Sequence, residues 1–411
     1  GTAAASHFGH PPEVPVPWQE SSPMSEKLAF VQACLDRKKR IVDICSEFGI
    51  SEKTGHKQLK RFREEGIKGL EERSHAGLTH RYRITPEVRE RVLELRRRYP
   101  LYGAQMLRDW LLQHEPGERW PAASSIGELL KRSNLIKSRR GSHHGRDERV
   151  ALDTGRTRAH EPNMVWTADF KGEFRLRSGT GVYCYPLTVL DLHSRFLLGC
   201  TALETTAVAA AKEIFTRLFR EYGLPKVLRT DNGIPFAQPN ALGRLGRLAF
   251  WWVKLGIRPE HITPARPSEN GAHERFHRTL KAATTKPSSP SFWAQQLRFD
   301  DFRTEYNTHR PHSSLPDHRP PGEFYSCSPR TYPARLPALV YPDSSAVRLV
   351  DMNGFIKWRN HGIFLSTNIA GDSVGIAETE GDRFTISYGA LELGHIEAEA
   401  NRFSPSVRWT G

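Results

Sequence analysis

Residues 164–170 read Met-Val-Trp-Thr-Ala-Asp-Phe, an extended run of β-branched and aromatic residues that carries one carboxylate, Asp169. This composition predicts a β-strand. The segments that follow read as two more strands, a helix and a fourth strand, over residues 182–190, 196–201, 205–222 and 226–229. Three strands, a helix, a strand and a further helix predict an α/β domain, which we place at 161–332.

Upstream of this domain, residues 25–75 predict a helix-turn-helix module. Residues 1–24 are rich in Ala, Pro, Gly and Ser and are expected to be a flexible leader. Ser51 is a good N-cap for a helix over 52–65, which follows a turn at Gly49. The outward face of this helix is basic, and its candidate DNA contacts are Lys53, Lys57, Lys60 and Arg61. Similar helical arrays also serve structural or protein-binding roles.

A second helical set, over 84–137, repeats this organisation. It begins with Thr85-Pro86, a cap and first-turn pair, and its last predicted helix ends in Lys131 and Arg132. Two basic copies in tandem favour DNA binding. The stretch 138–160 contains Arg139 and Arg140 and little apolar content, so we interpret it as a basic linker, with contact to a DNA backbone as a further option.

Downstream of the α/β domain, residues 341–400 predict a small β-barrel that is separate from it. Five short strands are expected, at 347–350, 355–358, 362–365, 373–377 and 383–387. Residues 341–411 contain 6 basic and 9 acidic residues, which is a poor composition for non-specific DNA binding. We therefore expect this part to contact another protomer or to order DNA that is bound elsewhere.

The whole chain is basic, with 60 Lys and Arg against 46 Asp and Glu, a net charge of +14. Such an excess favours a polyanionic partner, and nucleic acid is the leading candidate. The 5 cysteines form no C-x-x-C pair, which argues against a disulfide framework or a cysteine-based zinc site. No apolar run approaches the roughly 18 residues of a membrane span, so a cytoplasmic protein without a membrane partner is expected.

Two aspartates fall where metal-assisted phosphoryl transfer would need them. Asp169 is an unusual charge inside an apolar strand. Asp231 follows the strand 226–229, and Asn232-Gly233 permits a sharp turn beyond the strand's carboxyl end, where α/β sheets usually bind ligands. A turn-forming aspartate is the ordinary alternative for Asp231.

The third carboxylate is expected from the helical segment 268–281. Glu274 shares one helical face with Asn270, His277, Arg278 and Lys281, whereas Glu269 is rotated from Glu274 by about 140°. Glu274 is therefore preferred as a metal ligand, although a solvated helix face would look similar. His273, His277 and His312 are interpreted as packing or DNA-contact residues, without a catalytic role.

These segments resemble integrase-type transposases of bacterial insertion sequences, which are similar to retroviral integrases. The resemblance is carried by 166–169, 229–233, 270–281 and 306–312, and it covers about residues 26–400. It implies an RNase-H-like catalytic core with a metal-binding triad at Asp169, Asp231 and Glu274, and a DNA contact at Lys281. The 42 residues between Asp231 and Glu274 exceed the family's usual spacing, which an insertion around 237–250 would explain.

The resemblance implies a metal-dependent DNA strand-transferase. It would bind the terminal inverted repeats of its element, cleave the 3′ ends and join them to target DNA with two Mg²⁺ or Mn²⁺ ions per active site. Its expected partners are double-stranded DNA and further copies of itself, at least a dimer on DNA, in a bacterial cytoplasm. A catalytically silent transposase-derived DNA-binding regulator and an RNase-H-like nuclease remain the alternatives.

Overall fold

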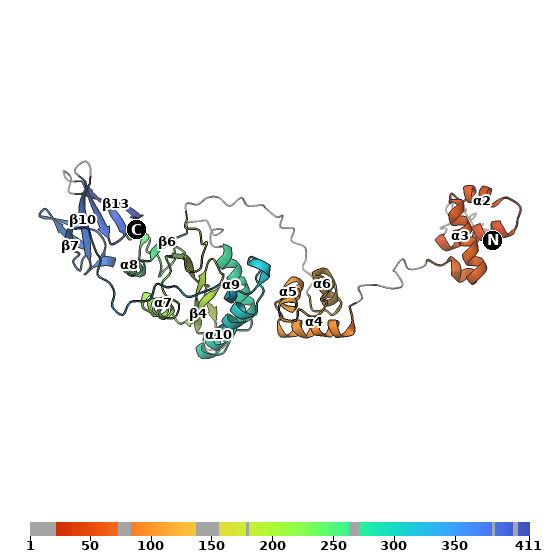
Figure 1. Ribbon diagram of the computed structural model, residues 1–411, viewed down its shortest axis with the longest axis horizontal. Coiled ribbons are helices and arrows are strands. Elements are labelled where there is room, and N and C mark those ends of the chain that lie inside the picture. Colours follow the sequence, from red (N-terminus) through yellow and green to blue (C-terminus); the bar gives the residue numbers. More distant parts are fainter. Residues whose placement is uncertain are drawn as a thin grey trace, which may run out of the picture. The chain divides into compact units, whose positions relative to one another are not determined.

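The computed structural model describes residues 22–72, 84–136, 156–177, 181–262, 271–379, 383–397 and 402–411 (Figure 1). The chain divides into two compact units, Gly1–Arg83 and Ile84–Gly411. Arg139, Arg140 and Asn270 lie outside the described residues.

The first unit contains three helices, α1 (Pro23–Leu35), α2 (Ile41–Glu47) and α3 (Glu52–Glu65), followed by a 3-10 turn at Gly66–Leu70. The Ser51 side chain accepts a hydrogen bond from the amide of Thr54 at 3.2 Å, as expected for an N-cap. At Gly55, a Cβ atom would lie 2.4 Å from the Cys45 sulfur, so glycine allows α3 to approach α2 closely. The helix-turn-helix prediction is confirmed for this unit.

The second unit begins with α4 (Pro86–Arg98), α5 (Ala104–His114) and α6 (Ala123–Arg132). Thr85 caps α4, and Pro86 occupies its first turn, as the sequence predicts. The apolar faces of the three helices form one core, whose largest buried members are Tyr102, Trp110 and Trp120. This is the second expected helical module.

A mixed sheet follows, with β4 (Leu197–Leu203), β3 (Tyr183–Asp191), β1 (Val165–Phe170), β5 (Val227–Thr230) and β6 (Arg258–His261) in spatial order; the short β2 (Phe174–Arg175) also pairs with β3. β1 runs antiparallel to β3 and parallel to β5. This order confirms the RNase-H-like core that the sequence predicts.

Helices cover both faces of this sheet, and the alternation of side chains along β1 assigns each face. Trp166 and Ala168 pack into the core shared with α7 (Val208–Tyr222) and α8 (Arg247–Lys254). Thr167 and Asp169 must therefore point to the opposite face, which α9 (Gly271–Thr284) and α10 (Phe292–Thr308) cover with Phe276, Leu280, Phe299 and other residues. The side chains of Thr167 and Asp169 on β1 therefore lie on the α9 side of the sheet.

The C-terminal part is larger than the sequence predicts. The expected strands appear as β7 (Ala346–Leu349), β8 (Phe355–Trp358), β9 (His361–Phe364), β10 (Ser373–Thr379) and β11 (Arg383–Tyr388), and β12 (Leu391–Glu397) and β13 (Arg402–Trp409) were missed. The pairing order is β13-β12-β11-β10-β7, with β8-β9 as a separate hairpin. Among the described strands no pairing joins β7 to β13, so a closed barrel is not established.

This C-terminal sheet packs on the α/β core, and residues of both share one hydrophobic cluster. The ring of Phe250 on α8 meets the ring of Tyr388 edge to face at 5.2 Å, and Lys254 pairs with Asp372. The segment around 237–250, where an insertion was expected, contributes directly, because the Asn368 side chain donates hydrogen bonds to Gln238 at 2.6 Å and to the Leu245 carbonyl at 3.0 Å. This segment therefore forms part of the contact surface for the sheet.

The second helical module contacts the end of α10 and the segment after it. Tyr102 hydrogen-bonds to Glu305, and the His318 ring lies 2.8 Å from a carboxylate oxygen of Asp109. None of the described helices is long and apolar enough to span a membrane.

Candidate active site

The strand register brings Asp169 and Asp231 together. β1 and β5 are parallel neighbours, and the last registered pair is Ala168 with Thr230. Asp169 and Asp231 are the next residues on each strand, so they occupy matching positions at the carboxyl edge of the sheet. Neighbouring strands lie about 4.8 Å apart, so the two carboxylates project from adjacent strand ends.

The turn after β5 holds Asp231 in place. Its carboxylate accepts a hydrogen bond from the amide of Gly233 at 3.2 Å, and the Asn232 side chain donates to the Ile262 carbonyl at 2.7 Å. A Cβ at Gly233 would lie 2.9 Å from Asp231 Oδ2, so a larger residue there would displace the Asp231 carboxylate. Burial raises the pKa of Asp231, while the Gly233 amide and nearby His261 act in the opposite direction. Partial burial of a carboxylate favours a cation beside it.

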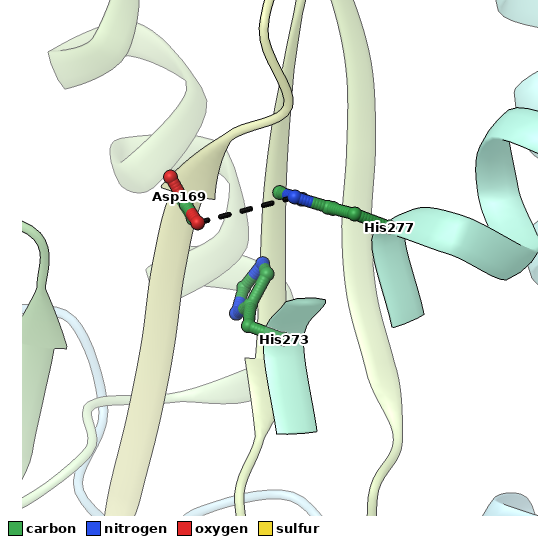
Figure 2. A group of neighbouring side chains, drawn as sticks. All are labelled: Asp169, His273 and His277. Atoms are coloured by element: carbon green, nitrogen blue, oxygen red, sulfur yellow. Dashed lines mark ion pairs between the residues drawn. The ribbon is translucent and has the colours of Figure 1, made fainter. Parts of the chain in front are cut away.

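Helix α9 faces Asp169 with two histidines (Figure 2). His277 Nδ1 lies 3.9 Å from Asp169 Oδ2. His273 is fully buried, with Nδ1 3.0 Å from the Thr167 hydroxyl and Nε2 2.7 Å from the Thr188 hydroxyl. Thr188 stands opposite Asp169 in the antiparallel β1–β3 register.

The Thr188 hydroxyl fixes the hydrogen-bond directions in this group. It lies 3.0 Å from the Asp169 carbonyl oxygen, which can only accept, so Thr188 donates its proton there. The hydroxyl must then accept from the Nε2–H groups of both His273 and His277, the latter at 2.8 Å. His273 Nδ1 accepts from Thr167, and His277 turns an unprotonated Nδ1 toward Asp169. Burial, together with the charge of Lys171, lowers the pKa of His277 to about 3, which agrees with a neutral ring.

Glu274 lies at the edge of this arrangement. Its side chain is exposed in the first turn of α9, as are those of Arg278 and Lys281 farther along the helix. In the described part of the chain, the group of acids and histidines close enough for a metal is Asp169, His273 and His277, without Asp231 or Glu274. Both ring nitrogens of His273 are committed to threonines, so we interpret His273 as an anchor of α9 and not as a ligand.

Thr188 and Lys171 are site residues that the sequence reasoning missed. Lys171 follows β1, is 9% exposed, and lies close enough to Lys281 for that charge, after burial, to lower its pKa. The signal for Lys171 was its position two residues after Asp169. Thr188 could be found only through the strand pairing, which the sequence does not give.

The carboxylates fit a hard divalent cation, because Asp169 and Asp231 offer oxygen ligands from adjacent strand ends. Most of the basic residues expected to bind DNA through the helical modules are exposed, namely Lys53, Lys57 and Lys60 on α3 and Lys131 and Arg132 on α6. Arg61 is half-buried.

Comparison with known families supports this arrangement. Two models described as integrase core domain match residues 159–267 and 255–321. A helix-turn-helix domain matches 26–77, and a homeodomain-like domain matches 54–130.

Viral polyproteins are among the similar sequences. The chain is 33% identical over 131 residues to a Gag-Pol polyprotein of baboon endogenous virus (strain M7), which is 32% of this chain and 7% of that protein. It is 29% identical over 166 residues to a Pol polyprotein of radiation murine leukemia virus (strain Kaplan), 39% of this chain and 26% of that protein. The chain thus spans about a quarter or less of these relatives.

Among solved structures, the HTLV-2 integrase catalytic core domain in complex with magnesium is 14% identical, with a TM-score of 0.32 over 41% of this chain and 99% of that one. The fold, the site and the family matches define a chain with an integrase core domain preceded by helix-turn-helix modules. These matches support a protein of the integrase and transposase type.

Proposed function

We propose that this protein is a DNA transposase of the bacterial insertion-sequence kind, which cleaves the 3′ ends of its element and joins them to target DNA. The observation that carries the proposal is the matching position of Asp169 and Asp231 on neighbouring parallel strands of an integrase core domain. A turn-forming role alone would not require an acid at the adjacent strand end.

Asp169, Asp231 and Glu274 are the residues that would hold two Mg²⁺ or Mn²⁺ ions. When bound, such ions would activate the attacking hydroxyl and stabilise the leaving oxygen of an in-line displacement. The first turn of α9 brings Glu274 to the same face of the sheet as Asp169, because its neighbour His273 is anchored on Thr167 and Thr188.

Basic residues around these acids would bind the DNA backbone. Lys171 and Lys281 lie on the α9 side of the sheet, and Arg278 is exposed between Glu274 and Lys281. Phosphate contacts of this kind position a duplex without reading its sequence. The helix-turn-helix modules would read the sequence of the terminal inverted repeats. The residues proposed for this role are Lys53, Lys57, Lys60 and Arg61 on α3, and Lys131 and Arg132 on α6.

The active form is proposed to be at least a dimer on DNA in the bacterial cytoplasm. The C-terminal strands, which carry more acidic than basic residues, would contact another protomer. We further propose that these strands form a small β-barrel. The segments at 138–160 and around Asn270 would contribute the remaining DNA contacts, including Arg139 and Arg140.

The test is a cleavage and joining assay with duplexes that carry the DNA flanking the gene, in Mg²⁺ or Mn²⁺. Wild type should release a 3′-hydroxyl and join it to a second duplex, and Asp231→Asn should abolish both steps while duplex binding is retained. Asp301→Asn, an exposed acid on α10, is the matched control and should leave both steps intact. Cleavage without joining would indicate a nuclease, and binding without cleavage would indicate a regulator.

The choice of the third acid is tested separately. Glu274→Gln should abolish joining, whereas Glu269→Gln should not. The reverse result would move the third ligand to Glu269.

A further inference from the structure

A cavity of about 230 Å³ lies beside α9, and neither Asp169 nor Asp231 lines it. It is bounded by the turn between β3 and β4, by α9, and by the segment that follows α10. Besides His273 and Asp191, the charged and polar residues of its lining include Arg195, Arg275, Arg310, His312, Ser313 and Ser314. Of the residues described above around Asp169 and Asp231, only Thr167 and His273 line this cavity.

Arg310 brings a guanidinium that is nearly enclosed and poorly satisfied. Its side chain is 12% exposed, and its closest acid is Glu305, at 3.8 Å. One face lies over the Tyr102 ring at 5.2 Å. A guanidinium has five N–H donors, yet among the described residues no side-chain hydrogen bond from Arg310 is found. These donors are therefore available to a ligand in the cavity.

Arg195 adds a second cation, held by a strained turn. Its φ is 64°, in the left-handed region that an arginine rarely adopts. The nearby carboxylate of Asp191 accepts instead from the amide of Asn163 at 2.7 Å and from the amide and hydroxyl of Ser194. Within the described part of the chain, Arg195 makes no hydrogen bond or ion pair, so its donors are available to the cavity.

Most charges around the cavity are positive, and the one carboxylate in its lining, Asp191, is buried and already accepts hydrogen bonds from Asn163 and Ser194. Burial lowers the pKa of Arg195, and Arg275 lowers it further, whereas Tyr306 and Asp191 raise it. Burial, with the charges of Arg195, Arg310 and Arg275, lowers the pKa of His312 to about 4. Repulsion among cations in a partly enclosed space is unfavourable unless an anion neutralises it.

We propose that this cavity is a binding site for a tetrahedral oxyanion, a phosphate group held by Arg195 and Arg310 with Arg275 at its mouth. Arginine suits this ligand because its donors match phosphate oxygens in pairs. The volume is sufficient for one such group, and Ser313 and Ser314 supply further donors. The phosphate is either that of a DNA backbone or a free anion; the site lies outside the proposed catalytic acids and does not depend on their activity.

The test uses the full chain and two variants. Arg195→Asn removes the charge but keeps a residue that tolerates a left-handed backbone, so the turn should fold. Arg247→Gln is the matched control, because Arg247 is an exposed arginine on α8 that does not line the cavity. Inorganic phosphate is titrated against chloride at constant ionic strength, with binding followed by calorimetry and by the shift in unfolding temperature.

Phosphate binding that is weakened about tenfold or more by Arg195→Asn, and unchanged by Arg247→Gln, supports a site for the free anion. A duplex titration gives the second arm. If the site takes a backbone phosphate, Arg195→Asn lowers the slope of log affinity against log salt by about 1 and bound duplex blocks phosphate. Equal phosphate and duplex binding by wild type and Arg195→Asn overturns the proposal, whatever the cleavage assay shows.

Discussion

Replacing Thr188 by valine should loosen the attachment of α9 to the sheet. The substitution keeps the β-branched shape that suits strand β3 and removes only the hydroxyl. That hydroxyl is completely buried, accepts from His273 and His277, and donates to the Asp169 carbonyl. One atom therefore connects α9 to both β3 and β1.

The magnitude follows from the groups left without partners. Each buried polar group that loses its hydrogen bond costs about 1–3 kcal/mol. Thr188→Val strands the Nε2–H of buried His273 and weakens that of His277, which is partly exposed and can recruit water. The expected local destabilisation is about 2–4 kcal/mol.

Hydrogen–deuterium exchange measures this effect on the region concerned, independently of the other domains. Peptides covering β1 and α9 should exchange about 30- to 1000-fold faster in Thr188→Val, since 1.4 kcal/mol corresponds to a factor of ten. Thr304→Val, at an exposed threonine on α10 that bonds only to the Asp300 carbonyl, should change exchange by less than a few-fold. If the two variants behave alike, Thr188 does not anchor the helix.

Two further predictions concern a helix cap and a titrating group. Ser51→Ala should destabilise the first unit by about 1 kcal/mol, because the Thr54 amide loses its acceptor. Unfolding followed by circular dichroism, with Ser51→Asp as the variant that keeps a capping side chain, would measure this loss of stability. His312 has a folded pKa of about 4, below its ordinary 6.5. The unfolded chain therefore binds more protons between these values, so stability should fall by up to about 3 kcal/mol as pH drops from 6.5 to 4. His312→Gln should remove this part of the pH dependence; identical urea midpoints across that range in both proteins would contradict it.

The sequence predicts the elements whose local signals are strong. The strand Val165–Phe170 and the helix Glu52–Glu65 have the predicted bounds, because alternation, a capping serine and turn glycines agree there. β12 and β13 were missed for a physical reason. Gly394 and Pro405 read locally as strand breakers, and Arg402 and Arg408 read as polar loop. These segments become strands through their mutual antiparallel pairing, which composition does not record.

The orientation of α9 shows a similar limit. The sequence analysis grouped Glu274 and His277 on one face because their spacing allows it. The structure buries the stripe His273, Phe276 and Leu280 instead, at positions i, i+3 and i+7, with His277 at its edge. The spacing of Phe276 and Leu280 predicts a buried stripe, but a histidine at its start predicts an exposed position. His273 can be buried because its two ring nitrogens are hydrogen-bonded to Thr167 and Thr188, which the sequence does not show.

The three proposed acids are positioned by different forces, and this makes them separable by mutation. Asp169 and Asp231 are aligned by the backbone pairing of β1 with β5, which does not involve α9. Glu274 is placed only by the docking of α9, and that docking depends on the buried bonds of its neighbour His273. Loss of the Thr188 hydroxyl should therefore displace the third acid while the first two keep their register. Because strand pairing fixes two of the proposed ligands and a hydrogen-bonded helix holds the third, a shift of α9 would move Glu274 alone.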